Sequence, residues 1–135
     1  ELGLNSFFAC RIDGVFPKMY VRSEVKQEKP YLPLAETMKS AQRSFSYENE
    51  EGSVVALWCP EFVKDLNLAG WHLHFISTDR ERGGHITNFE ILKGKVTLDR
   101  ISQFSLTLPE DANFKDLNLM NLQDDVKEVE KAEDL

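Results

Sequence analysis

Residues 70–85 read GWHLHFISTDRERGGH and hold all three histidines of the chain. His72 and His74 lie two residues apart in an apolar, aromatic run, so on a β-strand both imidazoles point to the same face. A polar, glycine-containing segment, residues 80–84, follows this run and predicts a turn. His85 then opens the next predicted strand. A hairpin made of these two strands would bring the third imidazole back beside the first pair.

The three histidines favour a metal site. Neutral imidazoles that converge from two strands and leave one coordination position open are the ligand set of a catalytic zinc. Imidazole also suits copper, iron and nickel, so the spacing leaves the metal open, with zinc as the first hypothesis. The alternative is a structural role without metal, because a single histidine is usually a surface residue or a core residue with its polar atoms satisfied. Three histidines within 14 residues, and none elsewhere, favour the metal.

Length and composition bound the class of protein. The chain has 135 residues, the size of one domain, and 41% hydrophobic residues, enough for a core. A net charge of −7 argues against a nucleic-acid partner, because binding to phosphates needs clustered lysine and arginine. The apolar runs are too short to span a membrane, and no charged-then-apolar leader opens the chain. Residue 1 is Glu rather than Met, which is typical of a processed chain, a trimmed chain or a fragment.

The two cysteines, Cys10 and Cys59, show no metal-binding or redox spacing. Free cysteine is among the residues most often buried, so we interpret both as small core residues of a protein in a reducing compartment. A cytoplasmic location is therefore expected. The alternative, a thiol nucleophile, lacks a neighbouring activating group in the sequence.

Alternation and turn signals predict a mostly β chain with one internal and one C-terminal helix. The expected strands are residues 6–12, 15–16 with 19–22, 44–47, 53–58, 70–76, 86–92, 96–98 and 104–108. The expected turns in this series are Asp13-Gly14, residues 49–52 and Lys93-Gly94. The expected helices are residues 34–41, with Leu34, Met38 and Ala41 as the apolar stripe, and residues 122–133.

Two of these predicted strands have distinctive features. Pro17 interrupts the arm that follows Asp13-Gly14, so we expect that arm to be an edge strand or to carry a bulge. Residues 53–58 form a near-continuous apolar run, which favours a central strand buried on both faces.

A metal site of this kind also needs a group that moves protons or steadies an anion. Each charged side chain is by itself more often a solvated surface residue. Arg22 stands out because it lies on a predicted strand rather than in a turn. Gly83-Gly84 lacks the helix of a phosphate-binding loop, and a tight turn with positive φ is the preferred interpretation. The charged candidates are Arg11, Arg22, Arg80, Arg82, Glu28, Glu61 and Asp79.

Several blocks of the sequence, taken in order, resemble α-acetolactate decarboxylase. The most specific combination is Gln27-Glu28-Lys29-Pro30-Tyr31 together with the histidine segment. The full set is residues 11–14, Arg22, residues 27–31, Pro33-Leu34, Pro60-Glu61, residues 70–75 and residues 83–85. The resemblance extends from about Asn5 to the end of the chain.

The resemblance implies a reaction and a set of site residues. It implies conversion of 2-acetolactate to acetoin and CO₂, with zinc and no organic cofactor. The implied zinc ligands are His72, His74 and His85. Arg22 matches an active-site arginine of the family, and Glu130 best matches a catalytic glutamate near the family's C-terminus. Glu133 is a weaker match, and from the sequence alone Glu130 is a solvated helix residue.

The resemblance also bears on architecture. Family members are about twice as long, and residues 1–135 resemble one domain, their C-terminal, zinc-binding half. The implied fold is α+β, a strongly bent mixed or antiparallel sheet against which one internal helix packs. The missing half would supply an active-site carboxylate and much of the pocket wall. Exposed sheet edges or an apolar face would then be covered by that half or by a second copy, which predicts such an association or a homo-oligomer.

The alternative class is a binding module. The small plant and prokaryote conserved (PPC) domain is of similar length and has a similar histidine hairpin. That resemblance implies a complete oligomeric chain that binds metal or small ligands without decarboxylation. Residues 27–31 and Arg22 favour the decarboxylase, and the chain length favours the binding module.

Overall fold

The computed structural model describes residues 3–29, 31–64, 66–116 and 127. Its five strands pair antiparallel in the order β2-β3-β4-β1-β5, and β1 also pairs with β2. Strands β1 to β4 thus close on themselves, and β5 extends the sheet along β1. The strands are β1 Phe7–Glu24, β2 Gln42–Cys59, β3 Gly70–Ser77, β4 Gly83–Glu90 and β5 Lys93–Ile101. The helices are α1 Leu34–Ala41, the 3-10 turn Glu61–Val63 and α2 Ala112–Lys115.

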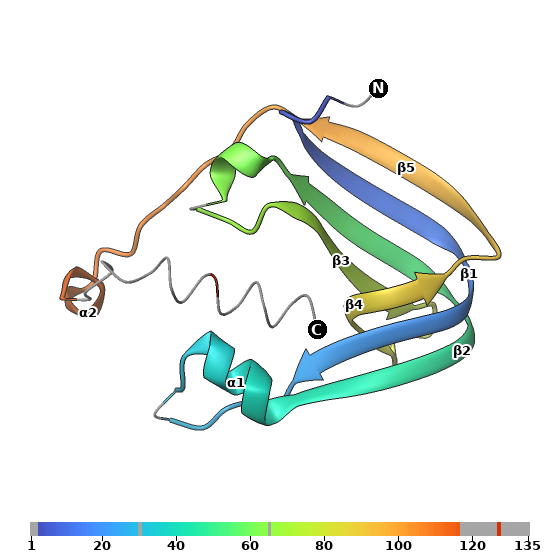
Figure 1. Cartoon of the computed structure of the whole chain (residues 1–135), viewed down its shortest axis with the longest axis horizontal. Coiled ribbons are helices and arrows are strands. Elements are labelled where there is room, and N and C mark those ends of the chain that lie inside the picture. The colour runs from blue at the N-terminus through green and yellow to red at the C-terminus, as the bar shows by residue number, and fades with distance from the viewer. Residues whose placement is uncertain (1–2, 30, 65, 117–126, 128–135) are drawn as a thin grey trace.

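Strands β1 and β2 form one long ribbon that bends sharply, with the β3–β4 hairpin inside the bend (Figure 1). Each strand has 18 residues, and they pair from Phe8 opposite Trp58 to Glu24 opposite Gln42. The predicted turns at Asp13-Gly14 and residues 49–52 are therefore wrong. Both segments lie inside the ribbon, where Gly14 faces Gly52. Glycine occurs in a strand where another part of the backbone approaches closely, as well as in turns. A local sequence signal cannot distinguish these two uses of glycine.

The arm that contains Pro17 is not an edge strand, because residues 18–22 pair with β2 on one side and with β4 on the other. The alternative that was predicted, a bulge, corresponds to a register shift in the β1–β4 pairing, which lies between Tyr20 and Val21 rather than at Pro17. The β1–β2 register continues from Phe16 to Lys18 with no pair at Pro17 itself, consistent with its missing N–H. Asn49 lies on the partner strand at this point with φ of 55°. A proline on one strand and a left-handed residue on the other mark the bent part of the ribbon.

The core lies between the bent ribbon and the β3–β4 hairpin. Phe16 is fully buried, and its ring packs edge-on against Phe75 at 5.5 Å and against Phe89 at 5.9 Å between centroids. Full burial of such a side chain contributes about 1.5–3 kcal/mol. The buried cluster consists of Phe16, Met19, Val21, Val54, Phe75 and Ile86.

The apolar run of β2 is buried on one face, not on both as predicted. Val54 and Ala56 point into the core with exposures of 0% and 3%, whereas Val55 and Leu57 remain 55% and 36% exposed. The run is apolar on two faces although the core of the described residues uses only one. Cys59 is buried and Cys10 half-buried, in agreement with their interpretation as small packing residues.

Helix α1 has the predicted bounds and follows Pro33 as its N-cap residue. The amide of Gln27 donates a hydrogen bond to Thr37 Oγ1 (2.7 Å) and its carbonyl accepts one from the Leu32 backbone N–H (2.9 Å). Gln27 thereby fastens the preceding loop to the helix. The backbone N–H of Val25 also donates to the carbonyl of Ala41 (3.2 Å), which holds the end of α1 beside the end of β1.

The C-terminal region departs from the predictions. Residues 104–108 form no strand, and Leu106 and Leu108 are 59% and 60% exposed. Phe104 instead stacks on the ring of Phe7 at 5.7 Å between centroids. The predicted helix over residues 122–133 lies outside the described residues, apart from residue 127. Among the described residues, no helix is both long enough and apolar enough to cross a bilayer.

Candidate metal centre

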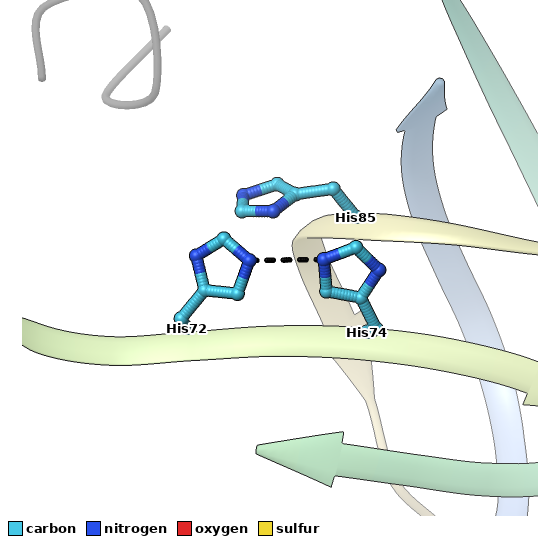
Figure 2. Close-up of side chains that lie close together, drawn as sticks. All are labelled: His72, His74 and His85. Atoms are coloured by element: carbon cyan, nitrogen blue, oxygen red, sulfur yellow. Dashed lines mark hydrogen bonds between the residues drawn. The ribbon is translucent and has the colours of Figure 1, made fainter. Parts of the chain in front are cut away.

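The β3–β4 hairpin brings the three imidazoles together, and Figure 2 shows the rings facing one another. His74 on β3 lies directly opposite His85 on β4, and His72 lies two residues back along β3. All three side chains therefore share the face of the sheet opposite the core residue Phe75. Ring centroids lie 4.9 Å apart for His72 and His74, 4.7 Å for His72 and His85, and 5.3 Å for His74 and His85.

The hairpin is fixed by its turn and by a glycine. The hydroxyl of Ser77 donates to Asp79 Oδ1 at 2.5 Å and accepts from the Arg82 N–H at 3.0 Å. Arg80 takes the left-handed conformation in this turn, with φ of 63°. The predicted tight turn at Gly83-Gly84 is wrong, because both glycines belong to β4.

Gly84 instead lets β4 approach β1. A Cβ atom there would lie 2.7 Å from the Arg22 carbonyl oxygen and 3.1 Å from Val21 Cβ. The φ of Gly84, 150°, also falls in a range that favours glycine. The missing side chain thus allows His85 to lie directly opposite Arg22 in the β1–β4 register.

The environment favours neutral imidazoles. Burial lowers the pKa of His85 to about 4, with further lowering by the positive charge of Arg22 and by the other two histidines. Burial, and then His72, lower the pKa of His74, while the carboxylate of Glu24 opposes this effect. A histidine must be neutral to ligate a metal, so the site is electrostatically prepared for one at neutral pH.

The donor geometry fits zinc. One ligand nitrogen from each histidine can be chosen so that all three lie within 4.8 Å of one another, and His72 Nε2 lies 2.9 Å from His74 Nε2. Zinc–nitrogen bonds of about 2.0–2.1 Å in a tetrahedron place ligand nitrogens about 3.4 Å apart. The distances in the structure bracket this value, so small ring rotations suffice to seat an ion. Among the described residues, these histidines form the cluster that could hold a metal.

Arg22 lies beside this cluster. It is 2% exposed, on the histidine face of β1, while its neighbour Val21 points into the core. A buried guanidinium next to the ligands supplies a permanent positive charge, because arginine does not deprotonate in proteins.

Glu24 is a further residue of the site that the sequence pattern does not predict. It lies two residues after Arg22 on β1 and so shares its face, close enough to His74 to affect that residue's pKa. The period of two along β1 was the available signal. The sequence pattern predicts that the strand ends at Arg22, so the predicted alternation does not extend to Glu24.

The structure does not place the other charged candidates at the metal centre. Their described ion pairs are with one another or with other charged groups: Arg11 with Asp13 at 2.8 Å, Arg82 with Asp79 at 2.9 Å and Glu50 at 3.4 Å, and Glu61 with Lys64 at 3.2 Å. Glu28 and Arg80 are exposed. Glu130 and Glu133 lie outside the described residues.

Comparison with known proteins identifies the family. A family model described as Alpha-acetolactate decarboxylase matches residues 2–121. The chain belongs to the alpha-acetolactate decarboxylase family. It is 44% identical over 128 residues to the alpha-acetolactate decarboxylase of Methanosarcina mazei and 37% identical over 129 residues to that of Bacillus subtilis.

The alpha-acetolactate decarboxylase fold extends over nearly all of this chain. The crystal structure of the enzyme from Bacillus subtilis strain 168 superposes with a TM-score of 0.86 at 37% identity and covers 97% of the chain. The chain spans about half the length of the curated relatives it matches: 44% of the Methanosarcina protein and 50% of the Bacillus protein. It covers 55% of the crystallised chain.

Proposed function

We propose that this chain provides a zinc-binding active site of an acetolactate decarboxylase, which converts 2-acetolactate to acetoin and CO₂. The observation that carries the proposal is the convergence of His72, His74 and His85 on one face, beside the buried Arg22, in a member of this family. The relatives carry the name of this activity. The metal is taken to be zinc because neutral imidazoles in this geometry suit its tetrahedral coordination.

The reaction sets the requirements of the site. The bond between the carboxylate carbon and the hydroxyl-bearing carbon breaks, CO₂ leaves, and the electron pair stays on the remaining fragment as an enediolate. A proton added to that fragment gives acetoin. Zinc, when bound, supplies Lewis-acid stabilisation of negative charge on substrate oxygens.

The residues of the chain have separate tasks in this proposal. The three imidazoles hold the ion and leave one side open to substrate. Arg22 steadies the anion, because its fixed positive charge lies next to His85. Glu130, assigned by resemblance alone, orients or moves the proton. The second proposed class is a metal-binding module without decarboxylation, in which the same three histidines would hold the ion.

The test is acetoin formation from 2-acetolactate by the zinc-loaded chain, compared with His74→Ala and with Ile76→Ala. Ile76 is an exposed residue on the same strand and face, two positions from His74, and serves as the matched control. Turnover that is lost in His74→Ala and kept in Ile76→Ala is expected. Full turnover in a metal-free His74→Ala protein would refute the proposal. Zinc binding without acetoin in the unaltered chain would mean that the pocket is incomplete, as expected of a fragment or of the binding module.

A further inference from the structure

The histidine face changes from cationic to apolar across four strands. Arg22 on β1 lies opposite His85 on β4, His85 lies opposite His74 on β3, and His74 lies opposite Val55 on β2. Directly opposed residues share a face, with Cβ atoms about 4.5–5.5 Å apart. The histidines thus have a buried positive charge on one side and an aliphatic side chain on the other.

A second aliphatic residue continues the apolar side. Leu57 lies opposite His72, and on its other side it faces Ala9 of β1. Val55 and Leu57 are 55% and 36% exposed although they alternate with the core residues Val54 and Ala56. Isolated exposed apolar residues are common and need no explanation. Here two successive outward positions of one strand are aliphatic, and each is the cross-strand neighbour of a predicted metal ligand.

The surface next to these residues is open. Val55 and Ile76 line a hollow of about 900 Å³ on this side of the sheet. The other walls of this hollow include Arg11, Asp13 and Gly52, and the three histidines, Arg22 and Leu57 do not line it, so the hollow extends away from the histidines on the far side of Val55. Across three strand intervals the row from Arg22 to Val55 spans about 14 Å along the sheet. A small hydroxy acid fits within this span with its carboxylate toward the arginine.

We propose that Val55 and Leu57 form the apolar wall of the substrate site and set the size of the alkyl group that it accepts. The inference rests on the proposed function, because it takes the substrate to be a hydroxy acid bound at the three histidines. The carboxylate points toward Arg22 and the alkyl group on the hydroxyl-bearing carbon points toward β2. A shorter side chain at position 57 enlarges the space between this wall and the histidines, so the site admits a larger alkyl group.

The experiment measures binding to the zinc-loaded chain by calorimetry. The two probes are the stable dihydroxy acid in which the keto group of 2-acetolactate is reduced to a hydroxyl, and its homologue with ethyl in place of methyl on the hydroxy-acid carbon. In Leu57→Ala the ratio of the two dissociation constants is expected to shift about tenfold in favour of the ethyl acid, the effect of one methylene in an apolar pocket. Leu57→Phe shifts the ratio the other way, and Val55→Ala shifts it as Leu57→Ala does.

Leu98→Ala is the matched control. Leu98 is 39% exposed, a fraction similar to the 36% of Leu57. It lies opposite Cys10, however, and therefore on the other face of the sheet, which Ala56 shares. Its replacement leaves the ratio unchanged. An unchanged ratio in folded, zinc-loaded Leu57→Ala and Leu57→Phe would overturn the inference, as would failure of both acids to bind the unaltered chain. A shifted ratio without acetoin formation would show that the apolar wall exists although this chain by itself does not catalyse the proposed reaction, and acetoin formation with an unchanged ratio would refute the apolar wall alone.

Discussion

The three histidines were accessible to sequence reasoning because two local rules place them. The period of two along a strand puts His72 and His74 on one face, and a polar turn returns the chain so that His85 joins them. The hairpin prediction is confirmed by β3 and β4. Glu24 and Val55 were not found in the same way, because their place beside the histidines depends on pairing with β1 and β2, which are distant in sequence.

Replacing one ligand should release the metal. His74→Ala removes one of three donors, and its zinc affinity should fall by more than the about 10–100-fold typical of losing an outer-shell partner. Competition with a zinc chelator measures this affinity. Ile76→Ala should bind zinc as the unaltered chain does, and equal affinity in the two variants would contradict the assignment.

Arg22 should matter for turnover rather than for metal binding. In Arg22→Lys the charge stays but the planar fork of donors is lost, so kcat should fall about 10²–10³-fold while zinc content is kept. Steady-state kinetics with metal analysis checks this. The control is Arg43→Lys, an exposed arginine on β2. A kcat for Arg22→Lys within about twofold of the control would exclude Arg22 from the reaction.

Glu24 should contribute a smaller electrostatic effect. Glu24→Gln removes a negative charge near His74, so zinc affinity should weaken by less than about tenfold, as expected for a solvent-exposed interaction. The affinity is measured by the same chelator competition at low and high salt. The control is Glu48→Gln, which lies far along the ribbon opposite Lys18. Equal affinities for the two variants at low salt would show that Glu24 does not act on the site.

At the scale of elements, local signals predicted helix α1 to the residue but misjudged the long ribbon. Pro33 and the spacing of apolar residues define α1 without help from the rest of the chain. Asp13-Gly14 has the composition of a hairpin turn, yet Asp13 pairs with Ser53 on one side and Lys95 on the other. Pairing with two strands outweighs a turn propensity, and that pairing cannot be read from a window of a few residues.

Gly84 should link the packing of two elements to metal binding. In Gly84→Ala the new Cβ meets the Arg22 carbonyl and Val21, so β4 must move away from β1 and carry His85 with it. We expect a destabilisation of about 1–3 kcal/mol and weaker zinc binding. Denaturant unfolding and chelator competition measure the two effects.

Gly94→Ala is the control for this variant. The nearest side-chain atom to its new Cβ would be the end of the flexible Ile91 side chain, at 2.7 Å, and β5 carries none of the histidines. Its zinc affinity should be unchanged even where its stability falls. Unchanged zinc affinity in Gly84→Ala would show that the approach of β4 to β1 does not position His85.

For the whole molecule, the residues alone predicted a mostly β chain, and the strong bend came from the resemblance. The closure of β1 to β4 depends on contacts between β1 and β4, which are about 65 residues apart in sequence, and no local period encodes such pairing. The described structure leaves β5 as an edge strand with Val96 62% exposed. The chain also spans only about half the length of its relatives. Association of this edge with the other half of the protein or with a second copy therefore stays a prediction.

The central claim, a three-histidine zinc site, is tested most directly by the zinc-to-chain ratio of the purified protein in native mass spectrometry. The account predicts one zinc per chain in the unaltered protein and none in His74→Ala. A chain that folds but retains no zinc after incubation with the ion would contradict the account and return the three histidines to a structural role.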